Sequence, residues 1–307
     1  MNRGFVRGGI CVLVLLLVGF FRVSYEDSVH RDFREKRLIP EQLNASTREK
    51  LGQRGAFIAL GGLRSLVATW RSFVALEHFT NGDWVELEKE YDLITTLSPH
   101  NEYHWATGGW HLAYNASGYF QQQQGMLPQQ RERLTKSYIR RGRQFFEDGI
   151  RNNPESWQLK SKLGNLYADE ERYPDYEKAA ELFLSAAESD DALDFYKRAA
   201  IYALARVPSR RQEAYDRLLV EWQSPENRLP MMQALRFALQ ENLNVPAEQR
   251  LMMKDIFGSP REAYFHLSNY YRRGDSFPQD KVLESLKALE ESLKIPAERS
   301  RIPPGAQ

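Results

Sequence analysis

The sequence predicts an all-α protein, a solenoid of stacked helical hairpins that follows an N-terminal transmembrane helix. From residue 56 almost to the end of the chain, apolar side chains recur at helical spacing. The alternation of β-branched residues that would indicate a strand is not sustained anywhere in the sequence. Near the N-terminus, an unbroken apolar stretch is flanked by Arg7 and Arg22. These observations divide the chain into a membrane anchor and a long helical body.

The predicted transmembrane anchor is the segment 8–23, preceded by a short tail of residues 1–7. The stretch from Gly4 to Val23 spans 20 residues, the length that a helix needs to cross a bilayer. A cleaved signal peptide is the alternative, but no pair of small residues at cleavage spacing follows Phe21. Residues 24–55 are charged and lack apolar periodicity through most of their length, so we expect a stalk or linker.

The anchor predicts a single-pass protein of the inner (cytoplasmic) membrane. A literal count of flanking positive charges would keep the body in the cytoplasm. Long domains, however, translocate largely regardless of charge, and a seven-residue tail rarely crosses. We therefore expect the body on the extracytoplasmic side.

Residues 157–188 carry the clearest hairpin pattern. A glycine between large residues lets two antiparallel helices approach closely, while aromatic rings and alanines fill the seam. Such a hairpin cannot bury its apolar face alone and must stack on neighbours. The residues that make the pattern are Leu163, Gly164, Tyr167, Ala179, Phe183 and Ala186.

On these residues the chain resembles tetratricopeptide-repeat proteins of the bacterial membrane-anchored type. Weaker repeats extend the resemblance over residues 56–226, with an inserted loop near 118–130. Residues 227–295 are expected to be C-terminal helices that cap the array, and residues 296–307 a disordered tail. Two helix caps are predicted along the way, one at Asp83 with Glu86 and one at Ser259 with Glu262.

The resemblance implies a concave groove lined by the first helix of each repeat. Carried over by register, the protein-binding positions are Tyr103, Trp110, Tyr114 and Asn165. Aromatic side chains that face a groove are good anchors for an extended peptide or a partner helix. The alternative is that Trp110 simply packs in the core, as most aromatics in helical arrays do.

Composition and motifs exclude several functions. Lys plus Arg number 42 and Asp plus Glu 41, so no net field attracts nucleic acid. The single cysteine, Cys11, lies in the apolar stretch, which excludes disulfides and cysteine nucleophiles in the body. Phosphate-binding glycine loops and serine nucleophile elbows are also absent. We therefore predict no catalytic residue and no cofactor.

Three histidines suggest a metal site. His100, His104 and His111 are close in sequence, but their spacing does not match that of zinc proteases. Structural or surface histidines are the favoured interpretation, and no metal is predicted.

The sequence therefore predicts a non-catalytic scaffold or adaptor, held at the membrane by its N-terminal helix. Its partners would be other proteins, chiefly membrane or envelope proteins, with no nucleic acid among them. One alternative is a metal-dependent enzyme that uses the cluster of His100, His104 and His111. A second alternative is a structural subunit buried in a larger membrane complex.

Overall fold

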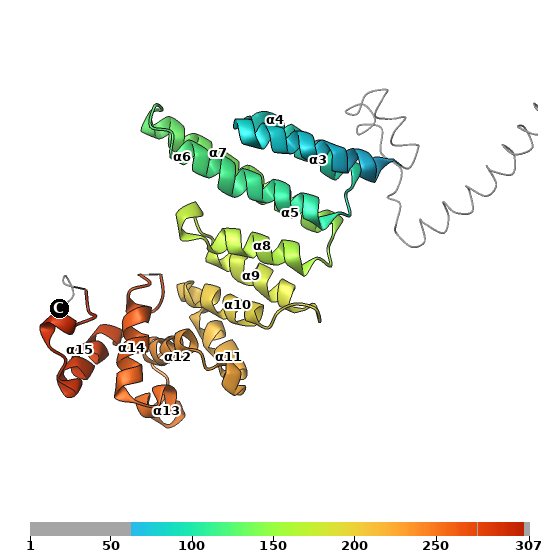
Figure 1. The fold of residues 1–307 in the computed structure, drawn as a ribbon. Coiled ribbons are helices and arrows are strands. Elements are labelled where there is room, and N and C mark those ends of the chain that lie inside the picture. Colours follow the sequence, from blue (N-terminus) through green and yellow to red (C-terminus); the bar gives the residue numbers. More distant parts are fainter. Residues whose placement is uncertain (1–62, 275, 304–307) are drawn as a thin grey trace, which may run out of the picture. The chain divides into compact units, whose positions relative to one another are not determined.

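The computed structural model describes residues 63–274 and 276–303, and in this part of the chain every regular element is a helix (Figure 1). The all-α prediction is therefore confirmed. The chain divides into two compact units, Met1–Gly108 and Gly109–Gln307. The predicted tail, anchor and stalk lie outside the described residues, as do residues 56–62 of the repeat region. None of the helices in the described ranges is both long enough and apolar enough to cross a membrane.

The first unit contains a helix pair, α3 (Arg64–Asn81) and α4 (Trp84–Leu97), followed by most of α5 (Glu102–Trp110). Helix α3 ends at Gly82, whose φ of 73° lies in the left-handed region that favours glycine. Asp83 precedes α4 as expected, but its side chain makes no capping hydrogen bond, so that part of the prediction is wrong. Instead, the Asp83 carboxylate lies 3.6 Å from the His78 ring nitrogen Nδ1.

The second unit opens on an unusual helix. A π-helical segment, η1 (His111–Ala116), leads into α6 (Ser117–Gln121), and the long helix α7 (Pro128–Asn152) packs against both. The loop expected at residues 118–130 is therefore shorter, because both of its ends are helical. Phe120 explains why the first residues of the expected loop are helical. Its ring stacks on the Tyr138 ring of α7 at 5.2 Å, a packing contact that is lost if Phe120 lies in an exposed loop.

The strongest sequence repeat forms the hairpin α8 (Trp157–Ala168) and α9 (Tyr176–Ala187), joined through the short helix η2 (Glu170–Arg172). A Cβ atom on Gly164 would lie 2.8 Å from the Phe183 ring, so glycine is what allows this close packing. The other residues of the pattern are buried between the helices. The predicted packing of this hairpin is confirmed.

The remaining helices follow one another through short connections, and consecutive helices pack together (Figure 1). Ser259 caps its helix as predicted, because its hydroxyl accepts a hydrogen bond from the Glu262 N–H. The elements are α10 (Phe195–Ala205), η3 (Pro208–Arg210), α11 (Arg211–Glu221), η4 (Pro225–Asn227), α12 (Pro230–Asn242), η5 (Ala247–Gln249), α13 (Met253–Phe257), α14 (Pro260–Tyr271), α15 (Val282–Leu293) and η6 (Ala297–Arg299).

The described part of the expected disordered tail is ordered. Ile302 is buried, and the backbone N–H of Arg301 donates to the Tyr264 hydroxyl at 2.7 Å. The Ser300 hydroxyl donates to the Glu290 carboxylate at 2.7 Å. The prediction of disorder from residue 296 is therefore wrong for residues 296–303. One apolar side chain and two hydrogen bonds hold this segment on α14 and α15.

Candidate functional site

The junction between α5 and the π-helical segment η1 places two large aromatic rings on one helix face. Trp110 and Tyr114 are four residues apart, and their rings stack at 4.1 Å with an interplanar angle of 20°. Half of the Trp110 surface is exposed, while Tyr114 is partly buried. Short π-helical segments are rare and occur frequently at functional sites. The aromatic pair is therefore the leading candidate for a binding surface in this unit.

A close helix contact fixes the backbone beneath this pair. A Cβ atom on Gly142 of α7 would lie 2.6 Å from the Ala113 Cβ and 2.7 Å from the Ala113 nitrogen. The two backbones therefore almost touch. The Ala113 carbonyl, in this π-helical turn, accepts from the Ser117 hydroxyl four residues later at 2.5 Å.

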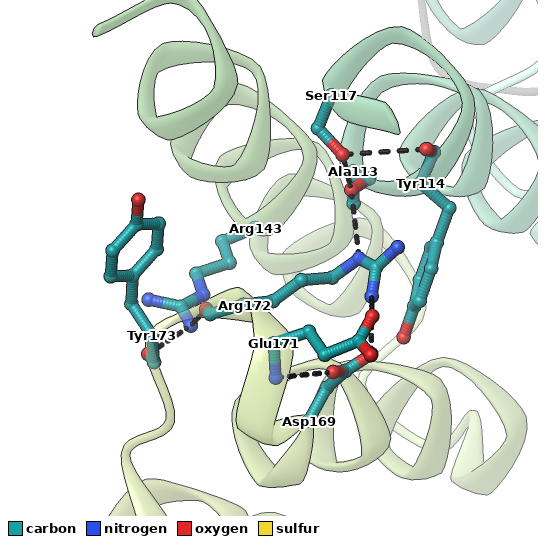
Figure 2. A network of polar contacts seen from close by, with 8 residues as sticks. All are labelled: Ala113, Tyr114, Ser117, Arg143, Asp169, Glu171, Arg172 and Tyr173. Carbon is teal, nitrogen blue, oxygen red and sulfur yellow. Dashed lines mark hydrogen bonds and ion pairs between the residues drawn. The ribbon is translucent and has the colours of Figure 1, made fainter. Parts of the chain in front are cut away.

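Arg172, on η2, braces Tyr114 from the side (Figure 2). Its guanidinium carbon lies 4.3 Å from the centre of the Tyr114 ring, within the range of a cation–π contact. Its Nη1 donates to the Asp169 carboxylate at 2.8 Å, and its Nε donates to the Ala113 carbonyl at 3.4 Å. The loop between α8 and α9 thus holds the aromatic pair through one largely buried arginine.

A second arginine holds that loop in place (Figure 2). Arg143 of α7 donates from Nη2 to the carbonyl oxygens of Arg172 and Tyr173, both at 2.8 Å. Its guanidinium also lies 4.3 Å from the centre of the Tyr167 ring. Tyr173 has a φ of 55°, so the chain turns sharply where Arg143 binds it. Arg143 therefore sets the position from which Arg172 reaches Tyr114.

Burial governs the ionisation of these groups. Desolvation lowers the pKa of Arg143, although nearby Tyr167 and acidic groups oppose that change. Burial raises the pKa of Tyr167 to about 12, helped by Glu147, whose carboxylate accepts from the Tyr167 hydroxyl at 3.1 Å. Burial and Asp169 also raise the pKa of Tyr114. Both phenols are thus neutral at physiological pH, and neither suits general-base catalysis.

The structure brings together only two of the four predicted groove residues, Trp110 and Tyr114. Asn165 is exposed on α8, and among the described residues no hydrogen bond joins it to the aromatic pair. Tyr103 belongs to the first unit, where the residue is 69% exposed and its ring contacts that of His104, edge-on at 5.9 Å. Arg143, Asp169 and Arg172 were missed by sequence reasoning.

The three histidines do not form a metal site. Within the described ranges, no group of three or more His, Cys, Asp or Glu side chains is placed to hold a metal ion. Burial lowers the pKa of both His104 and His111, which favours their neutral forms. The amide Nδ2 of Asn115 donates to the His111 Nδ1 at 2.9 Å, so His111 serves the local packing of η1.

A cavity of about 630 Å³ lies elsewhere in the second unit, between α10, α12 and α14. Its volume is within the range of small-molecule sites. Two arginines and no carboxylate line it, and the His266 Nδ1 is 2.7 Å from the Gln233 amide oxygen, so Nδ1 is the donor. The lining residues are Tyr202, Leu229, Pro230, Met231, His266, Asn269, Tyr270, Arg272 and Arg273.

Comparison with known proteins assigns no family to this chain, because no family model and no curated protein matches it.

Proposed function

We propose that this protein is a non-catalytic scaffold of tetratricopeptide-like helical hairpins that binds partner proteins at the membrane. The observation that carries the proposal is the Trp110–Tyr114 pair, a half-exposed indole stacked on a ring that Arg172 holds in place. The expected partners are membrane or envelope proteins, which bind around Trp110. The apolar segment 8–23 supports an anchor in the inner membrane with the body outside the cytoplasm.

The braced geometry suits binding for an energetic reason. A partner that covers Trp110 gains the burial of a large apolar surface, and tryptophan is enriched among residues that dominate binding energy. Because Tyr114 is already fixed by stacking and by Arg172, little side-chain freedom is lost on association. Arg172 already has a carboxylate partner, so its charge adds little to affinity. Binding through this surface should therefore depend weakly on salt.

A matched control is available in the same unit. Phe265 is exposed to 49%, almost the same as Trp110 at 50%, and Arg301 lies 4.3 Å from its ring centre. Replacing either aromatic with alanine removes a half-exposed ring, and in each place an arginine contacts the aromatic cluster, Phe265 itself at one and the Tyr114 ring beneath Trp110 at the other. Only the Trp110→Ala change should reduce binding if the Trp110–Tyr114 surface is the contact.

The test is a photo-crosslinking experiment on the full-length protein in its own membrane. A photoreactive side chain at position 110 should give discrete crosslinked products, whereas the same group at position 265 should not. Partners identified by mass spectrometry are then titrated against both alanine variants, each checked for folding by circular dichroism. If Trp110→Ala is folded and binds its crosslinked partner with unchanged affinity, the proposed surface is wrong.

A further inference from the structure

Helix α3 turns most of its large apolar side chains away from α4, the helix that it packs on; the exception is Phe79, whose ring contacts Trp84 of α4 edge-on at 5.8 Å. Toward α4 it buries small residues, Ala68 and Ala75, which let the two helices approach closely. Three leucines, one tryptophan and one phenylalanine of α3 and its N-cap lie on another face, with between 51% and 65% of each residue exposed. These residues, here called the α3 stripe, are Leu63, Leu66, Trp70, Phe73 and Leu76.

The spacing of the α3 stripe fits a second helix. From Leu63 to Phe73 the positions are separated by three, four and three residues, as in the seam of a coiled coil. Leu76 extends the apolar surface beyond Phe73, and Glu77 then stands at the next seam position. The stripe is therefore a bounded surface that covers most of α3.

The polar side chains of α3 allow this face to be buried at low cost. The Thr69, Ser72 and Thr80 hydroxyls donate to carbonyls of their own helix at 2.9, 3.0 and 2.9 Å, so dehydration leaves no unpaired donor. The cation Arg71 is paired with Glu90 of α4. The stripe itself contains no charged residue.

We propose that a second copy of this chain covers the α3 stripe, so that the protein forms a dimer in which two α3 helices cross in antiparallel orientation. A neutral apolar surface is complementary to itself, which a twofold interface requires. The pattern is also nearly symmetric about Trp70: antiparallel pairing sets Leu66 against Phe73 and Leu63 against Leu76. The indole rings would meet at the twofold axis.

The size of the α3 stripe matches a dimer contact. From the exposed fractions, the five side chains present roughly 650 Å² on one copy, so pairing buries about 1,300 Å² in total. Stable interfaces begin near this area, whereas the apolar patches of monomers are usually smaller. This interaction goes beyond the proposed partner surface at Trp110, because it lies in the other unit and involves the chain itself.

The first test compares the mass of the full-length protein, in mild detergent, with that of two variants. The Trp70→Glu/Phe73→Glu double variant buries carboxylates in the apolar contact, with like charges near the twofold axis, and should raise the dissociation constant by about 30-fold or more. The control Val85→Glu changes a 55% exposed apolar residue on α4, outside the stripe, and should remain dimeric. Because all three changes are at exposed positions, circular dichroism should be unchanged. A wild-type monomer at every concentration, or a double variant as dimeric as the wild type, overturns the proposal.

The second test uses cysteine crosslinking in native membranes, where no detergent competes for the apolar surface. With the only cysteine removed by Cys11→Ser, the variants Leu63→Cys and Leu76→Cys are oxidised separately and together. In an antiparallel pair, the two copies of residue 63 are about 20 Å apart along the helix, too far for a disulfide. We expect crosslinks only when the two variants are mixed. Crosslinking of Leu63→Cys with itself contradicts the antiparallel arrangement, and a lack of any crosslink contradicts the dimer.

Discussion

Gly142 offers the sharpest test of how the candidate site is built. In Gly142→Ala, the new methyl group would lie 2.6 to 2.9 Å from the Cβ, nitrogen and Cα of Ala113, closer than real Cβ contacts occur. Two of these atoms belong to the backbone of η1, so no side-chain rotation relieves the clash. Helix α7 and η1 must instead move apart, which displaces the backbone that carries Trp110 and Tyr114.

The expected size follows from two opposing effects. Overpacking against a backbone costs about 3 kcal/mol, at the upper end of the usual range for inserted methyl groups. Replacing glycine with alanine inside a helix stabilises the folded state by about 1 kcal/mol. The net loss in the free energy of unfolding should therefore be about 2 kcal/mol. In the control Gly118→Ala on α6, nothing lies within 4 Å of the new methyl group, so only the helical gain applies.

The assay is urea denaturation followed by circular dichroism, with hydrogen exchange to localise the effect. Exchange is needed because helical arrays can unfold in parts. Gly142→Ala should lose stability and expose amides of α7 and η1, whereas Gly118→Ala should gain about 1 kcal/mol. If the two variants are equally stable, with unchanged exchange near Ala113, the close contact between α7 and η1 does not hold the site.

Three further changes test individual interactions. Ser156→Ala removes the α8 cap that accepts from the Leu159 N–H and should cost about 1 kcal/mol in urea denaturation; a cost near zero would show that the cap is dispensable. Arg172→Met should cost about 1–2 kcal/mol and alter the emission of Trp110, which among the six tryptophans is obtained by difference from Trp110→Phe; an unchanged Trp110 emission would refute the brace. For His111, whose pKa burial lowers, the unfolded chain takes up a proton near pH 6.5 before the native state does. The stabilising contribution of neutral His111 is thus complete above that pH and is lost as the pH falls below it. His111→Gln should flatten this loss below about pH 6.5; an unchanged slope would show that His111 does not cause the loss.

The sequence was most informative where local pattern and packing agree. The contact of Gly164 with Phe183 was predictable because a small residue and a ring recur at fixed repeat spacing. The cap at Ser259 was predictable because serine, proline and glutamate each favour the same helix end. Such features depend on residues close in sequence or on a recognisable repeat.

The candidate site was only half predictable. Repeat register indicated that Trp110 and Tyr114 share a helix face, where their rings do stack. The π-helical segment η1 has no composition signal, since π-helical pairing depends on what packs against the turn. Arg172 reaches Ala113 across 59 residues of sequence, and its loop reads simply as a charged turn. The apolar face of α3 was hidden for a related reason: helical periodicity does not say which face a neighbour covers.

The hydrogen bonds from Arg143 to two consecutive carbonyl oxygens have a consequence for proteolysis. The peptide bond between Arg172 and Tyr173 follows an arginine on an exposed turn, where trypsin would be expected to cut. Its carbonyl oxygen, which a protease must polarise, is already bound by Arg143. Cleavage at this bond therefore requires the turn to detach first. The rate of tryptic cleavage after Arg172 therefore measures how often this turn detaches from Arg143 and Arg172 leaves Tyr114.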